Sequence, residues 1–295
     1  MSIVLETKEN EPQSSEIIKY LSDSDIKQEP QNDDELVKEV QNYTKEQILY
    51  LIEISSKCER FQHVIFAYEN LYTLFPSTFL SLDELSPLET SLKVFVAQKQ
   101  KNLNILYKLY QRSQNKEADF EDMDNDNQFL LNAITLERKK IEEQINSYVN
   151  RYLKVIDNFI LKNITVKNKG VDREIEVFLY RMKGDINKYL SQIESDDAQK
   201  KIYLNNAKNY YLNSYNLATQ YMKVSDLSSL NTAVAYVKFL VYFGGNKGGA
   251  KNLLRGLVSK EEIISLYSSI LSDEKEKSDL VKEIFAINNE LNNDK

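Results

Sequence analysis

Two cations and a tyrosine in residues 177–190 are spaced so that one anion can meet all three. Arg181 and Lys188 are seven residues apart, and two turns of a helix would place them on one face, about 10 Å from each other. Tyr189 adds a hydroxyl beside the second cation, and such a group suits a phosphate. The alternative is a solvated basic face on which Arg181 pairs with Asp185 at i, i+4, and periodicity alone favours this alternative.

Two other patterns suggest a binding loop but lack essential residues. Residues 122–126 carry three aspartates spaced like the start of a calcium loop, but Asn127 replaces the required glycine and Ala133 the required glutamate. The glycine-rich run at 244–249 follows no strand pattern, and no Lys-Ser/Thr pair comes after it. We interpret both as solvated connections between helices.

The residue types used most often in catalysis and metal binding are scarce. His63 is the only histidine and Cys58 the only cysteine, so a cysteine zinc site and an internal disulfide are excluded. Neither residue has a second ligand or a nucleophile nearby in sequence, and no carboxylate pair is marked for acid–base chemistry. We expect a protein that is not an enzyme and needs no metal and no cofactor.

The composition indicates a helical, cytoplasmic protein. Seven glycines and four prolines in 295 residues are too few to punctuate many short strands. The formal charge of −7 argues against nucleic-acid binding. The most apolar stretch, residues 234–243, contains Lys238 and is too short to cross a membrane. One cysteine fits a reducing compartment, so we expect neither a nucleic acid nor a membrane as partner.

Apolar periodicity predicts an all-α fold of eight to ten helices without a strand. Thr44 and Gln47 form a capping box at the first helix, Pro87 is expected in the first turn of the third, and Gly184 is expected to admit a neighbouring helix. The expected helices cover residues 44–58, a second helix ending near 76, 88–111, 128–163, 173–193, 198–222, 227–243, 250–259, 261–272 and 274–291. Residues 1–43 are expected to form an acidic, mostly mobile extension to a helical domain at 44–291.

Residues 177–190, VFLYRMKGDINKYL, resemble the signature of the 14-3-3 proteins, VFYLKMKGDYYRYL. Two further stretches agree in order and spacing: residues 56–61, SKCERF, are similar to the family's AEQAERY, and residues 155–163, VIDNFILKN, to LLEKFLIPN. The resemblance extends from about residue 44 to 291. It implies about nine antiparallel helices that form a cup with an inner amphipathic groove. It also implies dimerisation and recognition of phosphoserine or phosphothreonine in extended segments of partner proteins.

The resemblance assigns site residues on the signature helix and on two later helices. Lys188 takes the place of a phosphate-binding arginine, Tyr189 that of its partner tyrosine, and Arg181 that of a groove lysine. On the later helices, Leu230 and Asn231 match a Leu-Asn pair whose asparagine holds the ligand main chain. Asn288 matches a second such asparagine, and Ile284 matches an apolar residue of the groove wall. Lys238 stands where the family has glutamate, which implies a more basic groove.

The third helix departs from the family pattern, which completes the phosphate clamp with a lysine and an arginine seven residues apart. One register places the uncharged Gln98 and Ile105 there, and a register shifted by three places Lys101 and Lys108 there. Replacing the main arginine with Lys188 also loses a bidentate fork. Phosphate affinity is therefore expected to be reduced or reorganised.

The family's dimer ion pairs are also eroded. Arg60 is retained, but its acidic partner position holds Gln144, and His63 and Lys140 replace an acid–lysine pair. We expect a homodimer or heterodimer with weakened ion pairs.

Three functional hypotheses follow from these observations. The first is an adaptor that binds phosphorylated Ser/Thr segments. The second is a phosphate-independent helical scaffold that kept the fold and lost part of the clamp. The third is occupation of the groove by the chain's own amino-terminal segment around Ser22 and Ser24.

Overall fold

The computed structural model describes residues 42–116, 124–167, 173–268 and 275–293. The chain divides into two units, residues 1–43 and residues 44–295, and every helix named below belongs to the second. The predicted acidic extension up to residue 41, which includes Ser22 and Ser24, lies outside the described residues, as do residues 117–123. Of the aspartate run interpreted as a connection between helices, Asp124 and Asp126 belong to helix α6.

The described residues form helices and no strand, so the all-α prediction is confirmed. None of the described helices has both the length and the apolar character needed to cross a bilayer. The helical elements are α3 (Lys45–Lys57), α4 (Phe61–Leu74), α5 (Leu82–Lys116), α6 (Asp124–Lys154), η1 (Val155–Leu161), α7 (Lys162–Lys167), α8 (Arg173–Ile193), α9 (Asp197–Tyr221), α10 (Leu227–Tyr242), α11 (Lys247–Val258), α12 (Glu261–Ser268) and α13 (Lys275–Asn293).

Local capping explains where the first helices begin. Thr44 and Gln47 form the predicted capping box of α3, in which each side chain bonds the other residue's backbone N–H. Helix α5 begins at Leu82, six residues before the expected start, because Ser81 and Glu84 form the same kind of reciprocal cap. Pro87 therefore lies inside the helix and not in its first turn.

The long helix expected at 128–163 is a run of three elements. Helix α6 passes directly into the π-helical η1 at Val155, and η1 passes into α7 at Lys162. The wider turn of η1 contains Asp157, whose carboxylate accepts a hydrogen bond from Lys183 of α8 at 2.8 Å. This bond fixes the signature helix against the preceding element.

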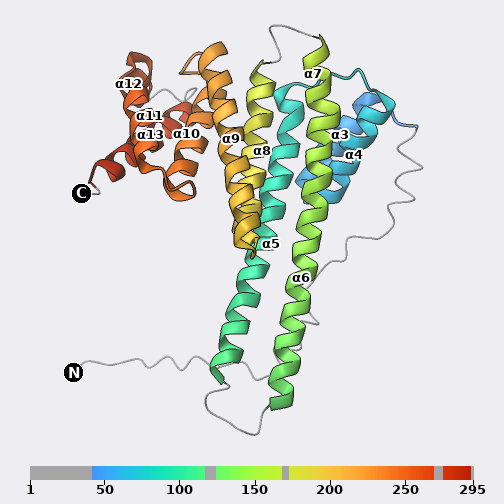
Figure 1. Cartoon of the computed structure of the whole chain (residues 1–295). Helices are drawn as coiled ribbons and strands as arrows, with labels where there is room; N and C mark the ends of the chain where they lie inside the picture. The colour runs from blue at the N-terminus through green and yellow to red at the C-terminus, as the bar shows by residue number, and fades with distance from the viewer. Residues whose placement is uncertain (1–41, 117–123, 168–172, 269–274, 294–295) are drawn as a thin grey trace, which may run out of the picture. The chain divides into compact units, whose positions relative to one another are not determined.

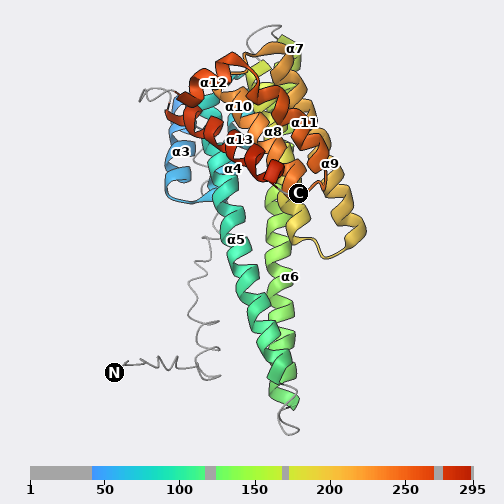
Figure 2. The same cartoon turned by 90° about the vertical axis from the view of Figure 1, so that its left-hand side faces the viewer.

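Neighbouring helices in the second unit are packed as a series (Figures 1 and 2). Helices α3 and α4 contact each other and α5, and α5 contacts α6 and α8. Helix α8 has its most extensive contact with α9, and both contact α10. Helix α13 contacts α10, α11 and α12. The helices that carry the predicted site residues, α5, α8, α10 and α13, are therefore consecutive neighbours.

Two buried groups of side chains hold these helices together. The first group includes several aromatic residues, among which Phe95 of α5 stacks on Tyr148 of α6 with ring centroids 4.0 Å apart. The buried Tyr68 donates its hydroxyl to the Glu84 carbonyl at 2.5 Å, which satisfies its polar atom in the core. The second group is mainly aliphatic and joins α9 to α13.

Candidate functional site

Helix α8 presents three charged residues on one face. Arg181, Asp185 and Lys188 follow one another at i, i+4 and i+7. Arg181 pairs with Asp185 at 3.7 Å and Lys188 with Asp185 at 2.7 Å. Only 11% of the Arg181 side chain is exposed. The i, i+4 pair of the alternative interpretation is therefore present, but the solvated basic face is not.

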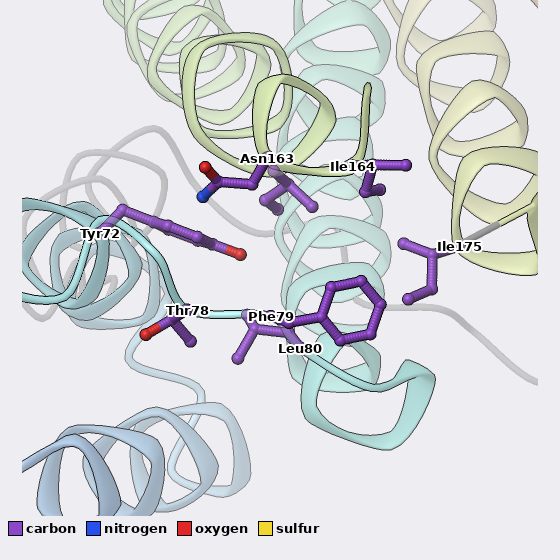
Figure 3. A pocket seen from close by; sticks show the side chains of 8 residues that line it. Tyr72, Thr78, Phe79, Leu80, Asn163, Ile164 and Ile175 are labelled. Carbon is purple, nitrogen blue, oxygen red and sulfur yellow. The ribbon is translucent and has the colours of Figure 1, made fainter. Parts of the chain in front are cut away.

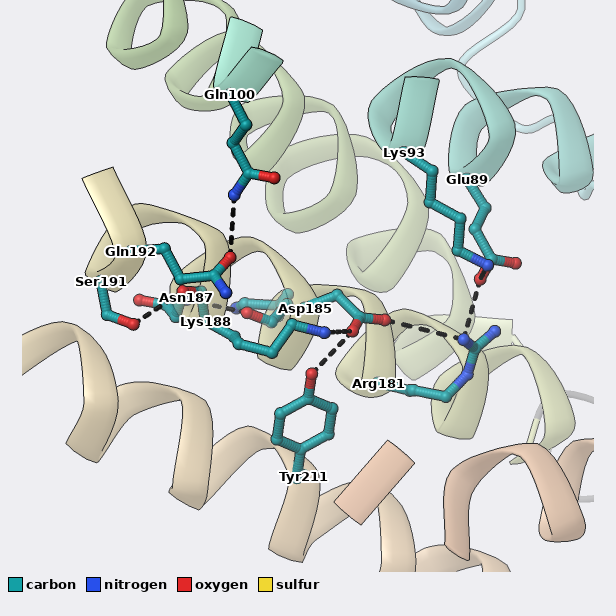
Figure 4. Close-up of polar contacts among 11 residues, drawn as sticks. Glu89, Lys93, Gln100, Arg181, Asp185, Asn187, Lys188, Ser191, Gln192 and Tyr211 are labelled. Carbon is teal, nitrogen blue, oxygen red and sulfur yellow. Dashed lines mark hydrogen bonds and ion pairs between the residues drawn. The ribbon is translucent and has the colours of Figure 1, made fainter. Parts of the chain in front are cut away.

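Helix α5 supplies a second carboxylate to this face. One oxygen of Glu89, Oε1, accepts from Arg181 at 2.8 Å and from Lys93 of its own helix at 2.6 Å (Figure 4). Because Arg181 and Lys93 bond the same oxygen, Arg181 Nη1 and Lys93 Nζ lie close together on this face. Lys93 is the more accessible cation, with 52% of its side chain exposed.

Helix α9 anchors the central carboxylate. The buried Tyr211 donates its hydroxyl to Asp185 Oδ1 at 2.7 Å. The ring of Tyr211 reaches this place because Gly184 has no Cβ; a Cβ built there would lie 2.8 Å from the ring. The prediction that Gly184 admits a neighbouring helix is confirmed. We refer to the following residues as the polar cluster: Glu89, Lys93, Arg181, Asp185, Lys188 and Tyr211.

The polar cluster carries one net positive charge, because three cations face two carboxylates. Burial opposes the charge on Glu89, but Arg181 and Lys93 outweigh burial and lower the pKa of Glu89 to about 2. Burial likewise opposes the charge on Arg181, and the carboxylates of Glu89 and Asp185 raise its pKa. Both groups are therefore ionised at neutral pH.

Tyr189 keeps its proton under the same conditions. Burial raises the pKa of its phenol, and the nearby Asp185 and Glu89 carboxylates raise it further, against a smaller opposing effect of Arg181. Its hydroxyl is therefore a hydrogen-bond donor. Such a donor beside Lys188 suits an anionic ligand.

The structure shows how side chains of the third helix, α5, meet α8. Glu89 and Gln100 are the α5 residues that bond α8, Gln100 through Gln192 at 2.9 Å. Gln98 points elsewhere and donates to Glu59 at 2.9 Å, and Ile105 is exposed. Lys93 and Gln100 are seven residues apart, the spacing of the family's clamp.

Lys101 and Lys108 do not belong to that face. A helix turns about 100° per residue, so these lysines point about 80–100° away from Gln100. Gln100 already meets the last turn of α8, which ends at Ile193. Lys108 lies about two turns farther along α5 than Gln100, which is toward the end of the helix at Lys116. Their placement in the phosphate clamp stays a prediction, and the contacts of α5 with α8 favour Lys93 and Gln100 instead.

The predicted residues on α10 and α13 divide into buried and half-buried groups. Leu230 and Ile284 are completely buried in the aliphatic group, and their predicted roles at the ligand and as a groove wall stay predictions. Asn231 and Asn288 are half-buried. Lys238 pairs with Glu283 at 2.5 Å, so its extra positive charge is balanced by the neighbouring helix.

Two small hollows elsewhere do not resemble anion sites. The first has a volume of about 10 Å³ and lies beside Tyr72, Phe79 and Ile175 (Figure 3). It has room for about one water molecule. The second, of about 110 Å³, is lined by the carboxylates of Glu142 and Glu194, which would repel an anion. No group of three or more potential metal ligands occurs among the residues that the structure describes.

Sequence reasoning missed the contribution of Glu89, Lys93, Gln100 and Tyr211 to this site. The i, i+4 pair of Glu89 and Lys93, with Gln100 seven residues later, was the signal available. Charged i, i+4 pairs are common on exposed helices, so the spacing alone does not distinguish this pair.

Comparison with known proteins shows which family this sequence resembles. A model of the 14-3-3 protein family matches residues 51–291. Protein BMH1 of Saccharomyces cerevisiae is 26% identical over 178 residues, which cover 60% of this chain and 58% of the yeast protein. The chain therefore spans under two thirds of that relative. The 14-3-3-like protein C of Glycine max is 24% identical over 199 residues, which cover 66% of this chain and 70% of the plant protein.

Proposed function

The chain belongs to the 14-3-3 protein family, and from this premise we propose that it is an adaptor that binds phosphoserine- or phosphothreonine-containing segments of partner proteins. A phosphate brings about two negative charges and several acceptor oxygens. The polar cluster offers cations from two helices and one net positive charge. Activity as a non-enzymatic adaptor in the cytoplasm is part of the same proposal.

The observation that carries this proposal is the convergence of Lys93 and Arg181 on one carboxylate oxygen. Two cations that hold a carboxylate oxygen in this way can hold a phosphate oxygen with the same geometry. Lys188 and the Tyr189 hydroxyl supply further donors on α8. Lys93 and Gln100 take the clamp positions on the third helix, so one of the family's two cations is kept there.

An extended ligand also needs partners for its main chain. We assign this role to the amides of Asn231 and Asn288, which lie on helices α10 and α13. Thr232, next to Asn231, lies 3.5 Å from the Ser214 hydroxyl, which donates to the Val177 carbonyl of α8. Asn231 therefore follows directly along α10 beside a residue that is linked to α8 through Ser214.

A charge-reversal pair tests the proposal. Lys188→Glu places a second carboxylate beside Asp185 and should reduce binding of a phosphoserine peptide to that of its unphosphorylated twin. Lys282→Glu is the matched control, because Lys282 also pairs with an aspartate three residues before it, at 3.2 Å on α13. Fluorescence anisotropy with a library fixed at one phosphoserine measures both. Equal affinity of the wild type for phosphorylated and unphosphorylated peptides would contradict the proposal.

One observation favours a second candidate, the phosphate-independent scaffold. Glu89 and Asp185 already neutralise most of the positive charge of the polar cluster. A scaffold of this kind would bind unphosphorylated partners, and Lys188→Glu would leave their affinity unchanged. The same titration therefore separates the two functions.

We also propose that the chain acts as a dimer with weakened ion pairs. Gln144, at a position that is acidic in the family, accepts a hydrogen bond from Lys99 at 2.7 Å, and Lys140 pairs with Glu137 within α6. Contacts of this kind replace charge pairs that would otherwise be offered to a second subunit. Apolar contact would then have to supply most of the association free energy.

A further inference from the structure

Glu89 differs from Asp185 in how it is held. Asp185 accepts from the buried Tyr211, from Lys188 and, at longer range, from Arg181, so its position is fixed from two helices. Glu89 accepts from Lys93 and Arg181, so the two cations hold its carboxylate. An incoming anion that pairs with Lys93 and Arg181 would replace the two ion pairs that hold the Glu89 side chain.

Protonation does not release Glu89. Its pKa is lowered to about 2 by Arg181 and Lys93, which outweigh the effect of burial. The carboxylate therefore stays ionised throughout the neutral range, and it leaves the two cations only by rotation of its side chain. With 17% of that side chain exposed, Glu89 already borders solvent.

From this geometry we infer that Glu89 is an internal anion that occupies the phosphate position between Lys93 and Arg181 and thereby selects dianionic ligands. This inference rests on the proposed function. A ligand carboxylate offers the same group as Glu89 but loses translational freedom on binding, whereas Glu89 is already tethered. A phosphate dianion adds charge and acceptors, so it can displace Glu89 where a glutamate in a peptide cannot.

The inference makes a specific prediction about Glu89→Gln. Removing the internal charge should tighten phosphoserine-peptide binding by about tenfold, the effect of one charge-assisted hydrogen bond. It should also give measurable affinity for a peptide that carries glutamate in place of phosphoserine. Glu142→Gln is the matched control, because it removes a carboxylate from an ion pair of 2.7 Å with Arg138 on α6.

The experiment titrates wild type, Glu89→Gln and Glu142→Gln with three peptide libraries fixed at phosphoserine, serine or glutamate. Circular dichroism melts establish that each variant is folded. Glu89→Asp keeps the charge but withdraws it by one methylene, so it should give an intermediate gain and replaces Glu89→Gln if that variant unfolds.

The possible outcomes separate this inference from the proposed function. If the wild type prefers phosphoserine and the folded Glu89 variants gain no affinity, the role of Glu89 is overturned and the adaptor function stands. If neither the wild type nor any Glu89 variant distinguishes phosphoserine from serine, both fall. A gain for phosphoserine and glutamate peptides in Glu89→Gln, without a gain in Glu142→Gln, supports both.

Discussion

At the residue scale, Lys188 is a point charge at a position where a planar fork would serve better. Its ammonium bonds one oxygen of Asp185 at 2.7 Å and lies 4.6 Å from the centre of the Tyr189 ring. An arginine at this position could keep the contact with Asp185 and offer a second pair of donors to a phosphate.

We therefore predict that Lys188→Arg tightens phosphoserine-peptide binding several-fold, by about 1 kcal/mol for an added charge-assisted bond. Isothermal titration with a phosphoserine peptide measures the change. Lys282→Arg serves as the control on α13 and should leave affinity unchanged. Weaker binding by a folded Lys188→Arg would mean that the position does not meet the phosphate.

Glu89 also contributes to stability in a way that depends on pH. Its pKa falls from 4.5 to about 2 in the folded chain, so its stabilisation is fully present above pH 4.5 and is lost as the pH falls toward 2. The shift corresponds to about 3 kcal/mol. The free energy of unfolding, measured by urea titration, should differ most between wild type and Glu89→Gln above pH 5. A difference that stays constant from pH 6 to pH 3 would contradict this origin.

The residues of α8 could be predicted because they form one contiguous segment. Arg181, Lys188 and Tyr189 share a face by spacing alone. Glu89, the partner of Arg181, lies ninety-two residues earlier, and several registers of a 35-residue amphipathic helix satisfy the apolar pattern. Only packing decides among them, so the contacts of α5 with α8 had to come from the structure.

At the element scale, the contact between α8 and α9 depends on one missing methyl group. The Tyr211 ring covers Gly184 so closely that a Cβ would lie 2.8–2.9 Å from three ring carbons, including Cγ near the root of the side chain. The ring is fully buried and cannot move aside easily.

Gly184→Ala should therefore destabilise the chain although alanine is the better helix former. Overpacking costs about 1–3 kcal/mol and the higher helix propensity of alanine offsets about 1 kcal/mol, so we expect a net loss of up to about 2 kcal/mol. Thermal and urea unfolding measure it. Gly256→Ala on α11 is the matched control, because nothing lies within 4 Å of a Cβ there, and it should be neutral or stabilising. Equal stability of the two variants would contradict the tight contact.

Helix boundaries were predictable where the sequence offers one capping motif and less predictable where two start signals lie close together. The Thr44–Gln47 box lies at the expected start of α3. Pro87 suggested a start close to itself, at about residue 88, but the cap formed by Ser81 and Glu84 begins α5 earlier. The π-helical turn of η1 leaves apolar periodicity nearly unchanged, so the pattern predicted one uninterrupted helix.

At the scale of the whole molecule, α3 leaves an apolar face without cover in the described unit. Tyr50, Ile54 and Cys58 are exposed at i, i+4 and i+8, close in sequence to Arg60. Ile54 is 41% exposed. A row of this kind beside the retained arginine is a suitable surface for a second subunit.

We predict that the chain forms a dimer through this face of α3 and that Ile54→Glu shifts it toward the monomer. A buried glutamate without a partner costs several kcal/mol, which corresponds to at least about a hundredfold weaker association. Sedimentation equilibrium measures the dissociation constant of wild type, Ile54→Glu and the control Ile202→Glu, whose side chain on α9 is 50% exposed. Because the dimer ion pairs are eroded, raising the salt concentration should change the wild-type constant little. A monomeric wild type, or equal weakening by both substitutions, would contradict this interface.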